Sequence, residues 1–320
     1  MKQRVLITRG IFPEVVESLA ARFDVEHNAE DRPWQPEELA RRLQGKHAAM
    51  ATVMDRFDEA ILAQSPDLRV IANIAVGFNN IDVPACTKRG IRVTNTPGVL
   101  DDTTADLTWS LLMAAARRIA EGDAYVRAGD WKIAFGVQYF LGQDIHHATL
   151  GIIGMGRIGQ AIARRARGFD MRILYNNRTR LAADDERKLG ASWVERDDLL
   201  AESDFVVVMA PYSPATHHLI GAAEINRMKP TAVLVNSARG GVVDDAALVE
   251  ALKAKRIAAA GLDVFEGEPK INSGFLELRN VVMTPHIGSA SRATRITMCR
   301  TAAENLTAVL EGRTPANPVN

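Results

Sequence analysis

Residues 149–180 read TLGIIGMGRIGQAIARRARGFDMRILYNNRTR, and the rest of the chain can be placed around them. The stretch opens with an apolar run at 150–153, which predicts a buried strand. Gly154-Met-Gly156-Arg-Ile-Gly159 follows at once, and alanines and isoleucines then recur at helical spacing before a second apolar run at 171–174. A strand, a glycine turn, a helix and a strand in this order form the βαβ unit that binds dinucleotides.

Each glycine of the turn has a separate role in that unit. Gly154 allows the tight turn, Gly156 lets the backbone approach a pyrophosphate, and Gly159 lets the helix pack closely on the strand. The phosphates are expected at the helix N-terminus, where free N–H groups and the helix dipole favour anions.

The end of the second strand predicts which dinucleotide is bound. Sites for NAD place an acid there, about twenty residues after the glycines, to bind the ribose 2′-hydroxyl. This chain has Asn177, Arg178, Thr179 and Arg180 instead. We expect NADPH to be preferred, with NADH possible, because the arginines and the threonine can receive a 2′-phosphate. The alternative is that the two arginines belong to a solvated loop.

Length and composition limit the possible classes of protein. A chain of 320 residues with 47% hydrophobic residues suggests about two packed domains. Lys+Arg and Asp+Glu both number 39, so nothing favours a nucleic-acid partner. Cys86 and Cys299 match no metal spacing, and no apolar run is long enough to cross a membrane. We therefore expect a soluble cytoplasmic protein.

The order of elements predicts two α/β domains built on parallel sheets. Strands and helices alternate through residues 1–100, and again from the glycine turn to residue 284. A helix is expected at Asp101–Ile119, an irregular segment at Gly122–His147, and a last helix at Ser291–Leu310 whose apolar face needs the first domain as partner. The expected fold is a Rossmann nucleotide-binding domain, 101–287, inserted into a flavodoxin-like substrate domain, 1–100 and 288–320.

Three charged or titratable residues follow strands of the second domain. They are Arg239 in NSARGGVVD, Glu268 in GLDVFEGEP and His286 in TPHIGSA. Ligands of open α/β sheets bind beyond the carboxyl ends of the strands. Histidine can donate a proton near neutral pH, a carboxylate beside it stabilises the imidazolium, and an arginine suits a substrate carboxylate. This set fits hydride addition to a 2-keto acid.

The motifs GMGRIG, NSARGGVVDD, AAAGLDVFEGEP and TPHIGSA, in this order, resemble those of the D-isomer-specific 2-hydroxyacid dehydrogenases. IAVGFNNIDV, TNTPGVLDDTTAD and GQDIHHATLGIIGMGRIG bring the chain closest to the glyoxylate/hydroxypyruvate reductases of that family, including those that reduce 2-ketogluconate. The resemblance covers nearly the whole chain. It implies reduction of a small 2-keto acid, such as glyoxylate, hydroxypyruvate or 2-ketogluconate, to the D-2-hydroxy acid.

The resemblance also implies roles for individual residues. His286 would donate the proton, Glu268 would pair with it, Arg239 would orient the substrate, and the N–H groups of Val76 and Gly77 would hold the substrate carboxylate. Asp263 would hold the nicotinamide carboxamide. The remaining cofactor contacts would come from Thr104, Arg157, Ile158, Ala210, Pro211, Thr216, Ser237, Ala238, Arg239, His286 and Gly288.

Some positions depart from the family, and two other functions stay open. Phe78-Asn79 stands where members often have Tyr-Asp, and Gly241 where they often have proline. Glu268 argues against a formate dehydrogenase, where glutamine is typical. An NAD-linked D-lactate or 3-phosphoglycerate dehydrogenase remains possible, although only Arg56 lies near the segments expected to bind a substrate phosphate. A corepressor-like protein that senses NAD(H) is the non-enzymatic alternative.

Two further features are the adjacent histidines and an aromatic segment. His146-His147 and His217-His218 would point to opposite faces if they lay on strands, so no metal site is expected. Residues Gly122–Phe140 correspond to the dimerisation arm of the resembling family, and they predict a homodimer.

Overall fold

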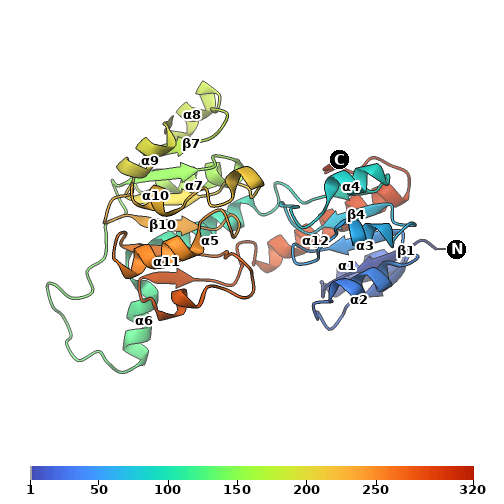
Figure 1. The fold of residues 1–320 in the computed structure, drawn as a ribbon, viewed down its shortest axis with the longest axis horizontal. Helices are drawn as coiled ribbons and strands as arrows, with labels where there is room; N and C mark the ends of the chain where they lie inside the picture. Colours follow the sequence, from blue (N-terminus) through green and yellow to red (C-terminus); the bar gives the residue numbers. More distant parts are fainter. Residues whose placement is uncertain (1) are drawn as a thin grey trace. The chain divides into compact units, whose positions relative to one another are not determined.

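The computed structural model describes residues 2–320, which divide into two compact units (Figure 1). One unit combines Met1–Leu100 with Ser289–Asn320, and the other is Asp101–Gly288. Each unit contains one parallel sheet with helices on both faces. The α/β fold with two doubly wound sheets is therefore confirmed.

The first unit contains a five-stranded sheet in the order β2-β1-β3-β4-β5, which is the flavodoxin-like order. Its strands are β1 (Arg4–Ile7), β2 (Asp24–His27), β3 (Ala48–Ala51), β4 (Val70–Asn73) and β5 (Arg92–Thr94). Its helices are α1 (Pro13–Ala20), α2 (Pro36–Leu43), α3 (Glu59–Ala63), α4 (Val83–Lys88) and α12 (Arg292–Leu310).

Alternation along the strands separates the two faces of this sheet. Val5 and Ile7 pack with α1 and α12, whereas Leu6, between them, packs with α2, α3 and α4. Because both faces are covered, the inner strands β1, β3 and β4 are almost continuously apolar, as is usual in parallel sheets. The predicted packing of the last helix on the first domain is confirmed; its N-cap, Ser291, accepts a hydrogen bond from Thr294 N at 3.1 Å.

The second unit contains a seven-stranded sheet in the order β12-β11-β10-β9-β6-β7-β8. Its strands are β6 (Thr149–Ile153), β7 (Arg172–Asn176), β8 (Ala191–Trp193), β9 (Phe205–Val208), β10 (Val233–Asn236), β11 (Ala259–Leu262) and β12 (Val281–Met283). Its helices are α5 (Asp101–Ala116), α6 (Ile119–Arg127), α7 (Arg157–Arg167), α8 (Ala183–Leu189), α9 (Arg196–Glu202), α10 (Ala222–Ile225) and α11 (Asp245–Lys253), with 3-10 turns η1 (Pro214–Thr216) and η2 (Ser273–Glu277).

The layers of this unit fix where a ligand can bind. Helices α5 and α7 pack on one face of the sheet, and α9, α10 and α11 on the other. The strand order reverses between β6 and β9, where Leu150 lies opposite Phe205. In doubly wound sheets such a reversal opens the ligand crevice, at the carboxyl ends of the strands. The glycine turn after β6 lies at that point.

Several element boundaries differ from the sequence predictions. The helix expected at Asp101–Ile119 ends at Ala116, whose carbonyl accepts a hydrogen bond from Gln143 N at 2.9 Å. Arg118 then adopts a positive φ of 54°, and a separate helix, α6, occupies part of the segment expected to be irregular. Helices α4, α8 and α9 and strand β8 were not predicted, because they are short and weakly periodic. No helix in residues 2–320 combines the length and apolarity needed to span a bilayer.

Candidate active site

The glycine turn after β6 is shaped by close backbone contacts. Gly154 has φ +105°, and a Cβ there would lie 2.6 Å from the carbonyl carbon of Met209. A Cβ on Gly159 would collide with the carbonyl oxygen of Gly154. Gly156 has no atom within 4 Å of a Cβ position, so packing in this unit does not require glycine there. The open space at Gly156 fits the close approach of a pyrophosphate.

Helix α7 begins directly after this turn. Its N-cap is Gly156, which has no side chain to satisfy the free N–H groups of the first turn. Arg157 and Ile158 therefore present backbone donors beside the open space. Asn177, the residue directly after β7, also fixes the turn, because its Oδ1 accepts a hydrogen bond from Met155 N at 2.6 Å. These features suit an anionic ligand at the helix N-terminus.

The loop after β7 uses its two arginines differently. Arg180 forms a double ion pair with Glu186 on α8, with both N–O distances 2.8 Å. The hydroxyl of Tyr175 donates to the same carboxylate at 2.7 Å. The hydrogen bonds from Arg180 and Tyr175 lower the pKa of Glu186 to about 2. Of the two arginines expected to receive a 2′-phosphate, Arg180 is thus already engaged.

Arg178 and Thr179 remain available in this loop. Both are exposed, and within residues 2–320 Arg178 has neither an ion-pair nor a hydrogen-bond partner. The cationic side chain best placed to meet a ligand here is therefore Arg178.

His286 and Glu268 form a hydrogen-bonded pair. His286 Nδ1 lies 2.7 Å from Glu268 Oε2, and the other carboxylate oxygen accepts a hydrogen bond from Phe265 N at 2.8 Å. The backbone N–H of His286 donates to Asp263 O at 2.9 Å, and the residue has φ +53°. Both partners are partly buried, with side-chain exposures of 32% and 20%. Because Nδ1 is occupied, Nε2 is the ring nitrogen left to meet a ligand.

The electrostatics of this pair favour an ionised carboxylate. Burial pushes the pKa of Glu268 upward, but the hydrogen bond and charge of His286, the Phe265 N–H and the charge of Arg239 bring it below its ordinary value. Burial also lowers the pKa of Arg239, which nonetheless keeps its charge because guanidinium does not deprotonate in proteins. The pair therefore holds an ionised carboxylate against Nδ1 of the histidine.

Arg239 lies in a loop that packs against the one carrying Glu268. A Cβ on Gly240 would collide with the carbonyl oxygen of Phe265, so only glycine permits this approach. Asn236 Nδ2 donates to the carbonyl of Arg239 at 3.3 Å, and the Arg239 side chain donates to Ala238 O at 2.7 Å. The structure therefore brings His286 and Glu268 into contact, with Arg239 close enough to affect Glu268.

Asp263, Thr104 and Gly288 gather at the end of β11. The Asp263 carboxylate accepts hydrogen bonds from Thr284 Oγ1 at 2.6 Å and from Ile287 N and Gly288 N, each at 2.8 Å. A Cβ on Gly288 would lie 3.2 Å from Asp263 Oδ2 and 3.3 Å from Thr104 Cγ2. Burial raises the pKa of Asp263. Among residues 2–320, Oδ2 of Asp263 accepts a hydrogen bond only from Gly288 N.

Other residues that were predicted to contact the cofactor use their side chains for hydrogen bonds or packing within the protein. The hydroxyl of Ser237 lies 2.5 Å from that of Thr108, and the hydroxyl of Thr216 donates to Pro211 O at 2.7 Å. Ala210, after β9, is buried against Gly154. These residues can offer a ligand mainly backbone groups and surface.

The loop of Val76 and Gly77 belongs to the first unit and follows β4. Its carbonyls are held inward, because Asn95 Nδ2 donates to Val76 O and Asn73 Nδ2 to Gly77 O, both at 2.8 Å. Within residues 2–320 the N–H groups of Val76 and Gly77 donate to no acceptor. Two free neighbouring donors suit a carboxylate. The supporting asparagines were missed from the sequence, although both stand at strand ends.

Comparisons with known proteins identify the family of the chain. Residues 109–288 match the family described as D-isomer specific 2-hydroxyacid dehydrogenase, NAD binding domain. The chain is 49% identical to a glyoxylate reductase of Pyrococcus horikoshii and 48% to one of Thermococcus gammatolerans, over all of this chain and 96% of each relative.

Solved structures extend the similarity to three dimensions. A Thermus thermophilus protein superposes with a TM-score of 0.92 at 44% identity, covering 99% of this chain and 100% of that one. The NADPH-dependent glyoxylate/hydroxypyruvate reductase of Sinorhizobium meliloti, solved with NADP and malonate, superposes with a TM-score of 0.89 at 32% identity, covering 100% of this chain and 97% of that one.

Proposed function

The chain belongs to the D-isomer specific 2-hydroxyacid dehydrogenase family and is an NAD(P)-dependent oxidoreductase, and within that family we propose that it uses NADPH to reduce glyoxylate and hydroxypyruvate. We include 2-ketogluconate as a further substrate. The observation that carries the proposal is the His286–Glu268 pair, whose 2.7 Å hydrogen bond leaves Nε2 of the histidine for a substrate oxygen.

The proposed chemistry is a hydride transfer coupled to a proton transfer. The nicotinamide, when bound, supplies the hydride to the keto carbon. His286 Nε2 gives its proton to the keto oxygen, and the hydroxyl forms as the C=O double bond becomes single. The Glu268 carboxylate stabilises the imidazolium before transfer and orients the ring. Solvent then returns the proton to His286.

The substrate carboxylate needs its own partners. We assign this task to Arg239 in the second unit. On the family resemblance we also propose carboxylate binding by the N–H groups of Val76 and Gly77 in the first unit, which have no acceptor among residues 2–320. A guanidinium binds carboxylates through paired hydrogen bonds, and fixing the carboxylate fixes the keto carbon beside it. The inward-held carbonyls of the two loop residues support this assignment.

The preference for NADPH rests on the loop after β7. The exposed and unpaired Arg178 and its neighbour Thr179 would receive the 2′-phosphate, and Asn177 would hold the turn. NADH would bind more weakly, without that contact. The Sinorhizobium meliloti relative is described as NADPH-dependent, which supports the assignment.

We also propose a homodimer formed through Gly122–Phe140. This segment and its continuation expose large apolar side chains, including Trp131, Ile133, Phe135, Val137 and Leu141, with relative exposures of 56% to 82%. Exposed large apolar side chains gathered in one segment are typical of an interface.

A substrate panel with both cofactors tests the function. The loss of reduced-cofactor absorbance should be faster with NADPH than with NADH, and kcat/KM should be highest for glyoxylate or hydroxypyruvate. Glycolate is achiral, so the D configuration is tested on the glycerate formed from hydroxypyruvate. A kcat/KM highest for 3-phosphohydroxypyruvate, or no turnover of any 2-keto acid, would overturn the proposal.

A further inference from the structure

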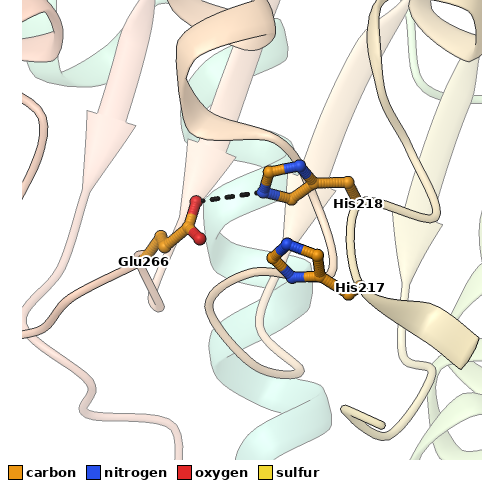
Figure 2. A group of neighbouring side chains, drawn as sticks. All are labelled: His217, His218 and Glu266. Carbon is orange, nitrogen blue, oxygen red and sulfur yellow. Dashed lines mark hydrogen bonds and ion pairs between the residues drawn. The ribbon is translucent and has the colours of Figure 1, made fainter. Parts of the chain in front are cut away.

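A second group of ionisable side chains lies in the second unit, apart from the His286–Glu268 pair. It consists of His217 and His218, which follow η1, and Glu266, which follows β11 (Figure 2). One potential ligand atom from each residue lies within 4.8 Å of the others. His218 Nε2 is 3.1 Å from Glu266 Oε2. Two imidazoles and a carboxylate are a common ligand set for divalent transition metals.

The sequence argument against a metal at this pair is wrong, because the histidines do not lie on a strand. They follow the 3-10 turn η1, and His218 has φ +50°. This backbone turn stacks the rings, with centroids 3.9 Å apart and an interplanar angle of 24°. Figure 2 shows both rings facing the side from which Glu266 approaches. The pair can therefore act on one ion.

Groups around the histidines orient their rings. The hydroxyl of Tyr212 lies 3.4 Å from His217 Nδ1, and Asp244 Oδ2 lies 3.6 Å from His218 Nδ1. Asp244 is itself fixed, because its Oδ1 caps α11 by accepting from Ala246 N and Ala247 N. Metal-binding histidines commonly have the nitrogen away from the metal held by a carboxylate or another polar group. Here that arrangement leaves both Nε2 atoms for an ion.

The backbone of the cluster is also fixed. Glu266 N donates to Asp245 Oδ2 at 3.0 Å, and His218 N donates to Gly241 O at 2.7 Å. Three loops thus meet at the cluster. Only side-chain torsions of an exposed histidine, a half-exposed histidine and an exposed glutamate need to change for the ligands to close on an ion.

We propose that His217, His218 and Glu266 form a binding site for a divalent transition metal of the zinc class, with water in the remaining position. Zinc–nitrogen bonds of about 2.0–2.1 Å put tetrahedral ligand atoms roughly 3.3 Å apart. The 3.1 Å separation of His218 and Glu266 already fits that spacing. His217 closes the site by rotation of its ring. The site does not depend on the proposed reductase activity.

The adjacent pair His146-His147 provides a matched control. These rings are 5.1 Å apart and nearly perpendicular, at 86°. Within residues 2–320 they belong to no group of three potential ligands. A double substitution there removes the same number of imidazoles without touching the proposed site.

The test is a Zn²⁺ titration of the full chain, freed of metal by a chelator and followed by calorimetry. Wild type and the His146→Gln/His147→Gln variant should each bind one equivalent. His217→Gln/His218→Gln and Glu266→Gln should weaken binding by at least about tenfold, as expected for the loss of a ligand contact of 1.4 kcal/mol or more. Thermal unfolding without metal should be the same in all variants, because the substituted side chains are exposed or half-exposed.

Three outcomes would overturn the proposal. One is no saturable binding to wild type. A second is equal loss in both double-histidine variants, which would indicate adventitious imidazole binding. The third is loss of binding in His286→Ala together with retention in His217→Gln/His218→Gln, which would place the ion at the His286–Glu268 pair.

Discussion

The loop after β7 and the His286–Glu268 pair, which joins residues that follow β12 and β11, arrange their charges alike but leave different groups open. After β7, Glu186 holds Arg180 in a double ion pair and leaves Arg178 without a partner. After β11, Glu268 holds Nδ1 of His286 and leaves Nε2 open. In both places a carboxylate holds one group and leaves a neighbouring one without a partner. The open group is a permanent cation after β7 and a ring nitrogen that can carry an exchangeable proton in the His286–Glu268 pair.

The largest effect is expected from removing the histidine of the His286–Glu268 pair. His286→Ala should lower kcat by about two to four orders of magnitude, because the keto oxygen loses its proton donor. KM for NADPH should change little. Steady-state kinetics with glyoxylate measure both, and His146→Ala, which alters an exposed histidine outside the site, serves as control. Turnover near wild type would show that another group donates the proton.

The next effect is expected from Glu268, the carboxylate that holds this histidine. Glu268→Gln keeps an oxygen for Phe265 N but removes the charge beside His286. We expect kcat to fall by about ten- to a hundredfold, because hydrogen bonds to charged groups contribute about 1.5–3 kcal/mol. Exposed Glu277→Gln is the control. If Glu268→Gln raises KM for the keto acid and leaves kcat unchanged, the carboxylate acts on binding rather than on the proton donor.

A smaller and more selective effect is expected from Arg178, the arginine without a partner in the loop after β7. Arg178→Ala should raise KM for NADPH by about tenfold and leave KM for NADH nearly unchanged, because one exposed charge-assisted hydrogen bond to the 2′-phosphate is lost. Arg180→Ala is the informative comparison, since its guanidinium is already paired. Equal losses for the two cofactors in Arg178→Ala, or a wild type that favours NADH, would contradict the assignment.

Predictions of local structure from the sequence were most accurate where glycine positions and the spacing of apolar residues determine the backbone. The strand, turn and helix around Gly154 follow from local residues, and so does the apolar face of α12. Prediction failed where contacts between particular loops and side chains decide. Packing of the Gly142–Gln143 backbone on Ala116 ends α5 early. The turn at His218, the Gly77 carbonyl held by Asn73 and the ion pair of Arg180 with Glu186 likewise depend on partners that sequence spacing does not reveal.

The smallest effect concerns Glu186, the carboxylate on α8 that pairs with Arg180 of the loop after β7. It is an effect on stability. The pKa of Glu186 is lowered from 4.5 to about 2 by Arg180 and Tyr175, so the folded state favours the ionised carboxylate. A lowered carboxyl pKa stabilises the fold above the unfolded-state pKa, and that stabilisation is lost as pH falls from about 4.5 towards about 2. Glu186→Gln should therefore be less stable than wild type at pH 6 and should approach it at pH 3.

Urea unfolding at the two pH values measures this difference. Asp185→Asn, which removes a more exposed carboxylate from the same helix, is the control. The comparison with the His286–Glu268 pair predicts that Glu186→Gln also weakens NADPH binding modestly. The reason is that an unpaired Arg180 would no longer hold the loop that carries Arg178. A stability difference that is the same at both pH values would show that Glu186 acts through packing and not through its charge, and the analogy with Glu268 would then fail.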